Sequence, residues 1–382
     1  MFNKNSGLHQ ILIRGVLLLV NVLTFSACQS AATTISPATN AGAAPLAVAD
    51  VPANNATPKP SAIGTPPELP ATFQSTILNP LDTPHSYIKN TCQYLKNKWI
   101  PTNAKPGTVV MIILLKGIYK GTVEEQGGID PINLDKLMQE LKKQDFHTVN
   151  TEELLAFMER NTNIPPRSVM IIQDGNHHYE NFTKQLGDYW HNWGWQIVNG
   201  WISQPDTLDS LWEENIALEK ERFVDHQSNG VMFGTYLTND SSKAVLDREL
   251  QGSRDAFAEH FGKNPIAFIW PGGGFGQRPV DAARQLKYQL GFTSNSRGPV
   301  MYNWVPLADE VDPNRPSYIP EGNIGDPLMT LPRYWPSEAL KAIDTVRAIG
   351  NQAATYAQEN KQTEIDYYNI VCAANYGQIP KP

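Results

Sequence analysis

A cluster of polar residues directly follows one short apolar run in this chain. The run extends from Val169 to Ile172 after two prolines, and Asp174, Gly175, His177 and His178 come after it. Apolar and β-branched residues between turn-forming residues are typical of a buried strand. Ligands of α/β folds bind beyond the carboxyl ends of such strands. The cluster is therefore a candidate pocket, and an ordinary turn between a strand and a helix is the alternative explanation of Asp-Gly.

Strand and helix signals alternate along the part of the chain that must position this cluster, and such alternation predicts an α/β fold with a parallel sheet or barrel. The predicted strands cover residues 109–115, 164–173, 195–202, 231–235 and 265–270. The predicted helices cover 133–143 with an Asn cap, a segment starting at Thr151, 179–193, 207–226, 241–261, 279–290 and 337–361. The Pro-rich stretch 298–332 is expected to be an extended loop over one face.

Composition and motifs argue against several functional classes. The chain has 382 residues with 31 Lys and Arg against 38 Asp and Glu, and it carries no basic cluster, so we expect no nucleic-acid partner. The sequence has no Gly-x-Ser-x-Gly motif, which argues against a Ser/His/Asp hydrolase. The glycines of 271–276 are not followed by Lys-Ser/Thr and are not a phosphate-binding loop.

The N-terminus has the features of an export signal. Lys4 and Arg14 precede the apolar run 16–25, and Ser26-Ala27-Cys28 follows it. This ending resembles a bacterial lipobox, so residues 1–27 are predicted to be a lipoprotein signal peptide and Cys28 to carry lipid. Gln29 in place of Asp then suggests sorting to the outer membrane, facing the periplasm. A plain secretory signal is the alternative.

Residues 28–74 are rich in Ala, Thr and Pro with few large apolar side chains, so they are predicted to form a flexible tether to a domain at 75–382. Cys92 and Cys372 lie near the two ends of that domain. An exported compartment permits a disulfide between them. Two separate buried thiols are the alternative.

Four segments together resemble the polysaccharide deacetylases of the NodB-homology group. They are 144–154, 166–175, 229–235 and 265–272, and the second matches the family's strand ending in Thr-Phe-Asp-Asp-Gly. The resemblance covers roughly 109–298 and is specific in order and spacing. It implies a deformed (β/α) barrel and hydrolysis of N-acetyl groups of a glycan, with a divalent metal held by one Asp and two His.

The residues that the resemblance assigns to this chemistry are largely altered. Asp174 stands at the metal-ligand Asp, but Gln173 replaces the base, and an amide does not take a proton at neutral pH. The two ligand histidines fall on Tyr236 and Asp240, and the last histidine of the chain is His260, so no later one can protonate the leaving amine.

Other side chains are candidates for binding a metal or a substrate. Asp174, Asp240 and His178 are a candidate rearranged site for Zn²⁺ or another divalent cation, with exposed turn histidines as the alternative, because adjacent histidines point to different sides of a helix start. Trp270, where the family places Tyr at a strand end, is expected to line the cleft. Arg333 is a candidate for substrate binding, with a structural salt bridge as the alternative.

The sequence therefore predicts a deacetylase-like envelope lipoprotein that binds an N-acetylated glycan, such as an exopolysaccharide or peptidoglycan, through a degenerate cleft. Such a pseudoenzyme needs no cofactor. One alternative is an active metal-dependent N-deacetylase with rebuilt ligands, and another is a scaffold that binds a second envelope protein.

Overall fold

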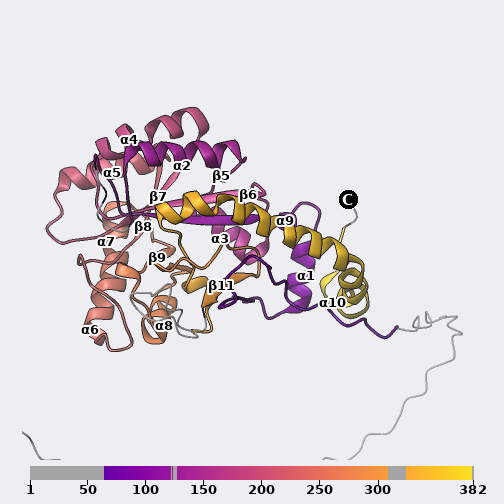
Figure 1. Ribbon diagram of the computed structural model, residues 1–382. Helices are drawn as coiled ribbons and strands as arrows, with labels where there is room; N and C mark the ends of the chain where they lie inside the picture. The colour runs from indigo at the N-terminus through magenta and orange to yellow at the C-terminus, as the bar shows by residue number, and fades with distance from the viewer. Residues whose placement is uncertain (1–63, 122, 124–126, 309–323, 381–382) are drawn as a thin grey trace, which may run out of the picture. The chain divides into compact units, whose positions relative to one another are not determined.

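A mostly parallel sheet forms the centre of the protein. The computed structural model describes residues 64–121, 123, 127–308 and 324–380. The strands follow the order β10-β9-β8-β7-β6-β2, with β5 pairing with β6, and Figure 1 shows β2 and β6 side by side. Their bounds are β2 Val109–Leu115, β5 His147–Thr148, β6 Arg167–Asp174, β7 Ile197–Trp201, β8 Val224–Ser228, β9 Ala267–Ile269 and β10 Leu290–Phe292.

A short irregular segment, residues 331–334, joins the two edges of this sheet. Leu331 forms a parallel bridge with Phe292 of β10, and Tyr334 forms one with Ile113 of β2. The amide of Tyr334 donates to Ile112 O over 2.8 Å. The segment therefore closes the sheet into a barrel, which confirms the predicted α/β fold of the deformed (β/α) barrel type.

Alternation along β6 separates two apolar layers. Met170 and Ile172 belong to the cluster inside the barrel, which contains side chains of the other strands and of the closing segment. Val169 and Ile171 belong to the cluster between the sheet and the surrounding helices. Successive strand residues point to opposite faces, so Asp174 continues the inner row and Gln173 the outer row.

Ten α-helices lie in the described part of the chain. Figure 1 shows α2 and α4 along one side of the sheet, with α9 crossing in front. Their bounds are α1 Thr91–Trp99, α2 Pro131–Lys143, α3 Thr151–Arg160, α4 Tyr179–Trp193, α5 Asp209–Lys220, α6 Lys243–Leu246, α7 Ser253–His260, α8 Gln277–Gln285, α9 Pro336–Tyr367 and α10 Ala373–Tyr376. Within the described ranges, no helix is long and apolar enough to cross a membrane.

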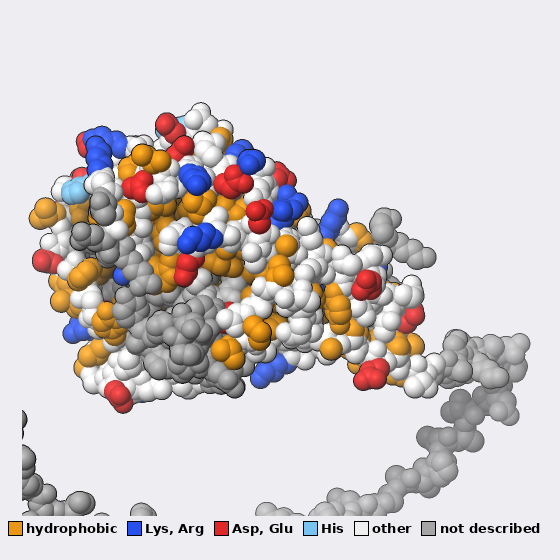
Figure 2. All heavy atoms as spheres, viewed as in Figure 1, with side chains coloured by type: hydrophobic (Ala, Val, Ile, Leu, Met, Phe, Trp, Pro, Cys, Tyr) orange, Lys and Arg blue, Asp and Glu red, His pale blue; other side chains and the backbone are white. Residues whose placement is uncertain are grey.

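Smaller elements complete the fold. Strands β1 Asp82–His85 and β11 Val305–Ala308 pair antiparallel, and β3 Gly117–Ile118 pairs with β4 Gly128–Ile129. Short 3₁₀ or π-helical turns are η1 Asp247–Gly252, η2 Pro271–Gly273, η3 Pro327–Met329 and η4 Tyr368–Cys372. On the face drawn in Figure 2, acidic and basic side chains are interspersed over the helices rather than gathered by sign.

Several predicted elements differ from the structure. Helix α2 begins at Pro131 and is capped by Asp130, not by an Asn. The predicted helix 207–226 ends at Lys220, and the strand expected at 231–235 lies instead at β8. Four of the five residues of β8 are polar, so hydropathy did not indicate a strand there. The predicted loop 298–332 contains β11 and η3, and its residues 309–323 lie outside the described residues.

The predicted disulfide is confirmed. Cys92 of α1 is bonded to Cys372 of η4, with Cα atoms 5.3 Å apart and a sequence separation of 280 positions. The packed region begins before the predicted boundary at residue 75, because Phe73 contacts Trp304 at a ring-centroid distance of 5.9 Å. Cys28 and the predicted signal peptide lie outside the described residues.

Candidate functional site at the carboxyl end of the sheet

An ion pair between Asp174 and Arg333 lies inside the mouth of the barrel. Asp174 is the last residue of β6, and Arg333 comes from the closing segment. Arg333 Nη1 donates to Asp174 Oδ1 over 2.7 Å and Nη2 to Oδ2 over 3.2 Å, while Nε donates to Thr293 O over 2.6 Å. The Arg333 side chain is 0% exposed and that of Asp174 is 18% exposed. Both carboxylate oxygens therefore already accept hydrogen bonds from a buried cation.

Asn229 is a neighbour of this pair that the sequence analysis missed. It directly follows β8, and a Cβ placed on Gly200 would lie 3.4 Å from Asp174 Oδ1 and 3.5 Å from Asn229 Cβ. Its Nδ2 donates to Ile269 O over 2.7 Å. The signal that could have found it is the Asn-Gly dipeptide, which ends β8 as Asp-Gly ends β6.

Gln173 and Asn199 fix the turn after β6. Gln173 is buried on the outer row of the strand, facing away from the barrel interior that Asp174 continues. Asn199 Nδ2 donates to Gln173 O over 2.8 Å and to Gly175 O over 2.9 Å. Gln173 therefore contributes its backbone carbonyl to this turn, while its side-chain amide, whose buried Oε1 accepts no hydrogen bond from the described residues, lacks both the chemistry and the orientation of a base beside Asp174.

The rearranged metal site predicted from Asp174, Asp240 and His178 is wrong. Nδ1 of His178 contacts Glu214 Oε2 at 3.0 Å, and His178 occupies the N-cap of α4. Asp240 is exposed in the loop after β8. In the described ranges, no three His, Cys, Asp or Glu side chains converge as metal ligands. Because Arg333 also occupies both oxygens of Asp174, the residues present do not fit the divalent metal that the resemblance implies.

The other histidine of the turn, His177, is also structural. Its Nε2 contacts Asp174 O at 3.0 Å. Burial lowers the pKa of this imidazole, and the neighbouring Asp174 carbonyl and carboxylate oppose that shift only in part. A neutral imidazole whose Nε2 donates to a backbone carbonyl stabilises the turn and is not positioned to ligate a metal with the Asp174 side chain.

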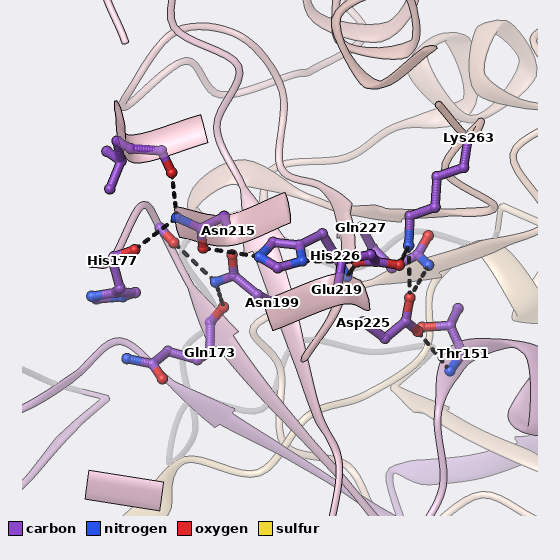
Figure 3. A network of polar contacts seen from close by, with 12 residues as sticks. Thr151, Gln173, His177, Asn199, Asn215, Glu219, Asp225, His226, Gln227 and Lys263 are labelled. Atoms are coloured by element: carbon purple, nitrogen blue, oxygen red, sulfur yellow. Dashed lines mark hydrogen bonds and ion pairs between the residues drawn. The ribbon is translucent and has the colours of Figure 1, made fainter. Parts of the chain in front are cut away.

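A buried polar network connects this turn to strand β8 (Figure 3). Asn215 Nδ2 donates to His177 O over 3.0 Å, and Asn215 Oδ1 lies 3.0 Å from Nε2 of His226. Nδ1 of His226 lies 2.8 Å from Glu219 Oε2. Burial lowers the pKa of His226, and Glu219 opposes this shift. Both ring nitrogens of His226 thereby have a polar partner, which allows this residue of β8 to be fully buried.

The network ends at a cluster of charges at the opposite end of β8. Lys263 Nζ contacts Glu219 Oε1 at 2.5 Å and Asp225 Oδ1 at 3.1 Å, and the amide of Thr151 donates to Asp225 Oδ2 over 3.0 Å. Although burial raises it, the pKa of Glu219 is lowered overall by the imidazole hydrogen bond and by Lys263. These groups join α3, α5 and β8, so they support the scaffold beneath the turn.

Two of the three predicted substrate-binding residues do not face solvent. Trp270 is 0% exposed, and its Nε1 donates to Met329 O over 2.7 Å, so its ring fills the core and the prediction that it lines the cleft is wrong. Arg333 forms the structural ion pair that was the alternative. Tyr236 is exposed on the loop after β8.

Several solved structures have a similar architecture. The chain is similar to the Streptococcus pyogenes deacetylase PplD in complex with acetate, with a TM-score of 0.50 and 16% identity over 64% of this chain and 99% of that one. IcaB from Ammonifex degensii gives a TM-score of 0.47 and 11% identity over 64% and 98% of the two chains. BC0361, a polysaccharide deacetylase from Bacillus cereus, gives 0.46 and 14% over 62% and 69%.

Neither a family model nor a curated protein sequence matches the chain. At 16% identity and a TM-score of 0.50, the similarity to PplD supports the architecture and not the chemistry. The parallel strand order, the closure by residues 331–334 and the similarity to PplD agree with the resemblance seen in the sequence. The chain has the NodB-type fold of the polysaccharide deacetylases.

Proposed function

We propose that the protein is a non-catalytic, deacetylase-like protein of the cell envelope that binds an N-acetylated glycan at the mouth of its barrel. The observation that carries this proposal is the bidentate pair of Arg333 and Asp174. In a metal-dependent hydrolase the carboxylate must be free to ligate the cation. Here the buried guanidinium neutralises it, and a divalent cation would have to displace an arginine side chain that is inaccessible to water.

The neighbouring positions support binding rather than hydrolysis. Gln173 cannot accept a proton, and Asn229 beside Asp174 offers an amide rather than an imidazole. Amide and hydroxyl groups of an N-acetylated sugar are neutral hydrogen-bonding groups, which suit a site whose charges are already paired. The carboxyl end of a parallel sheet is the general position of ligand sites in such folds.

The location in the envelope rests on the N-terminal sequence. We propose that residues 1–27 are removed, that Cys28 carries the lipid, and that the segment up to the packed region is a tether from the outer membrane, facing the periplasm. The Cys92–Cys372 disulfide is consistent with export to an oxidising compartment. An exopolysaccharide or peptidoglycan strand is then the available glycan.

Three measurements on the full-length protein test this proposal together. Calorimetric titration with chitopentaose and with oligomers of poly-β-1,6-N-acetylglucosamine is expected to show binding. Elemental analysis is expected to show no stoichiometric Zn²⁺, and amine release from either glycan is expected to equal the buffer blank.

Each unfavourable result has a distinct meaning. Stoichiometric metal together with amine release would overturn the non-catalytic assignment in favour of an active N-deacetylase. If neither glycan binds, the glycan-binding function is refuted, and the scaffold that binds another envelope protein becomes the better hypothesis.

A further inference from the structure

Exposed apolar side chains are concentrated on one loop at the mouth of the barrel. Eight large hydrophobic side chains of the described residues are exposed, and three of them are Met232, Phe233 and Tyr236. Their exposed fractions are 38%, 79% and 52%. Single exposed apolar residues are ordinary, but three within five residues form a patch. The loop follows Asn229, so the patch lies on the same edge of the sheet as Asp174.

A buried carboxylate holds this loop in place. Glu249 belongs to the π-helical turn η1 and is fully buried. Its Oε2 accepts hydrogen bonds from the amides of Val231 at 2.7 Å and Met232 at 3.0 Å, and its Oε1 pairs with Arg248 at 2.7 Å. Burying a carboxylate is costly unless its hydrogen bonds are made. Here two of those bonds stabilise an otherwise exposed loop, and π-helical turns are frequent at functional sites.

The ring of Tyr236 is supported by a glycine. The nearest ring carbon lies only 2.0 Å from the position that a Cβ on Gly272 would take, so no other residue fits there without displacing the ring. Gly272 also has a φ of +61°, which glycine adopts readily. One side of the Tyr236 ring therefore packs on the backbone that follows β9, while about half of the side chain remains exposed.

The chemistry of the loop favours an uncharged ligand. The stretch from Asn229 to Asn239 contains no Lys, Arg, Asp or Glu. A loop that binds anionic lipid or a charged polymer would be expected to carry basic or acidic residues. Rigid aromatic rings lose little conformational entropy on binding, and they can pack on the C–H faces of neutral pyranose rings.

We propose that Phe233 and Tyr236 form an aromatic rim that stacks on successive sugar rings of a neutral, N-acetylated glycan held beside Asp174 and Asn229. Glu249 is the positioning residue that fixes this rim. The inference rests on the proposed function and adds the residues that would select a neutral polymer over its de-N-acetylated, cationic form. It also implies that an oligomer binds more tightly than a single N-acetylglucosamine.

Calorimetric titration of the full-length protein with chitopentaose, its de-N-acetylated counterpart and N-acetylglucosamine tests the rim. Phe233→Ala and Tyr236→Ala are each expected to weaken chitopentaose binding by roughly three- to tenfold, corresponding to the loss of one aromatic contact. Ile132→Ala and Leu208→Ala remove comparably exposed apolar side chains, 82% and 70% exposed, from other parts of the chain and are expected to leave the affinity unchanged.

Glu249→Gln tests the positioning role. It should weaken chitopentaose binding and accelerate hydrogen exchange of the Val231 and Met232 amides. If Glu249 acts through the rim, its effect on affinity will not add to that of the Phe233→Ala, Tyr236→Ala double variant, whereas an independent role would add fully.

The outcomes separate the two proposals. If the wild type binds chitopentaose and both aromatic variants bind it equally well, the rim is refuted while the proposed glycan-binding function stands. Equal or tighter binding of the cationic oligomer would also overturn the preference for a neutral glycan. If the wild-type protein binds neither chitopentaose nor oligomers of poly-β-1,6-N-acetylglucosamine, the proposed function is refuted, and the rim with it.

Discussion

Replacing Asp174 and replacing Arg333 should lower the free energy of unfolding by different amounts. Asp174→Ala leaves a fully buried guanidinium with only one of its three observed acceptors, Thr293 O, and we expect a loss of about 3–5 kcal/mol in the free energy of unfolding. Arg333→Met keeps most of the buried volume and leaves a carboxylate that water still reaches. Its cost should be smaller, about 1–3 kcal/mol.

The double variant Asp174→Ala, Arg333→Met tests whether the two side chains act as a unit. With both charges removed, no buried ion is left unpaired, so its cost should fall short of the sum of the single costs by about 2 kcal/mol or more. Urea unfolding followed by tryptophan fluorescence measures all four proteins, and urea does not screen charges as guanidinium does.

Lys243→Ala is the matched control, because it breaks the exposed Lys243–Asp247 pair and should leave the midpoint within experimental error. Additive single costs, or a change below about 1 kcal/mol for Asp174→Ala, would refute the view that the pair is a buried, tightly coupled unit.

Three further predictions concern the scaffold. Replacing both Cys92 and Cys372 with Ser should lower the free energy of unfolding by about 3–5 kcal/mol, because their bond closes a loop of most of the domain; urea unfolding with no difference from wild type would contradict this. The folded-state pKa of Glu219 is depressed by the adjacent imidazole and Lys263 despite burial, so its contribution is present above the unfolded-state pKa of about 4.3 and is lost as pH falls through the lower folded-state value. Glu219→Gln should therefore flatten the acid limb of a stability profile as the pH falls below the unfolded-state pKa, and an unchanged slope would count against the assignment. Trp270→Ala should cost about 3–5 kcal/mol by opening a cavity, and a decrease in glycan affinity without loss of stability would show instead that the ring contacts ligand.

The stability of the barrel is explained by its apolar packing. The barrel is stabilised by its two apolar layers and by the closing segment, none of which needs a metal. At the mouth of the barrel, the buried guanidinium of Arg333 balances the charge of Asp174.

Local sequence predicted an element correctly where the residue types directly reflect burial or a helix end. The apolar run at 109–115 predicted β2 within its exact bounds because a strand buried on both faces contains no polar residue. Helix α4 also matched its prediction at both ends, since Gly194 in the left-handed conformation stops it. The two cysteines left in the domain indicated their pairing, which the structure confirms.

Only the tertiary structure decided the composition of the site. The polar strand β8 is buried because distant side chains satisfy its hydrogen bonds, so hydropathy placed the strand too late and missed Asn229. Arg333 reaches Asp174 across 159 residues because the closing segment bridges β10 and β2. The sequence by itself determined the fold class and located Asp174 at a strand end. Whether that carboxylate faced a metal or an arginine depended on contacts between segments far apart in the chain, which no local pattern records.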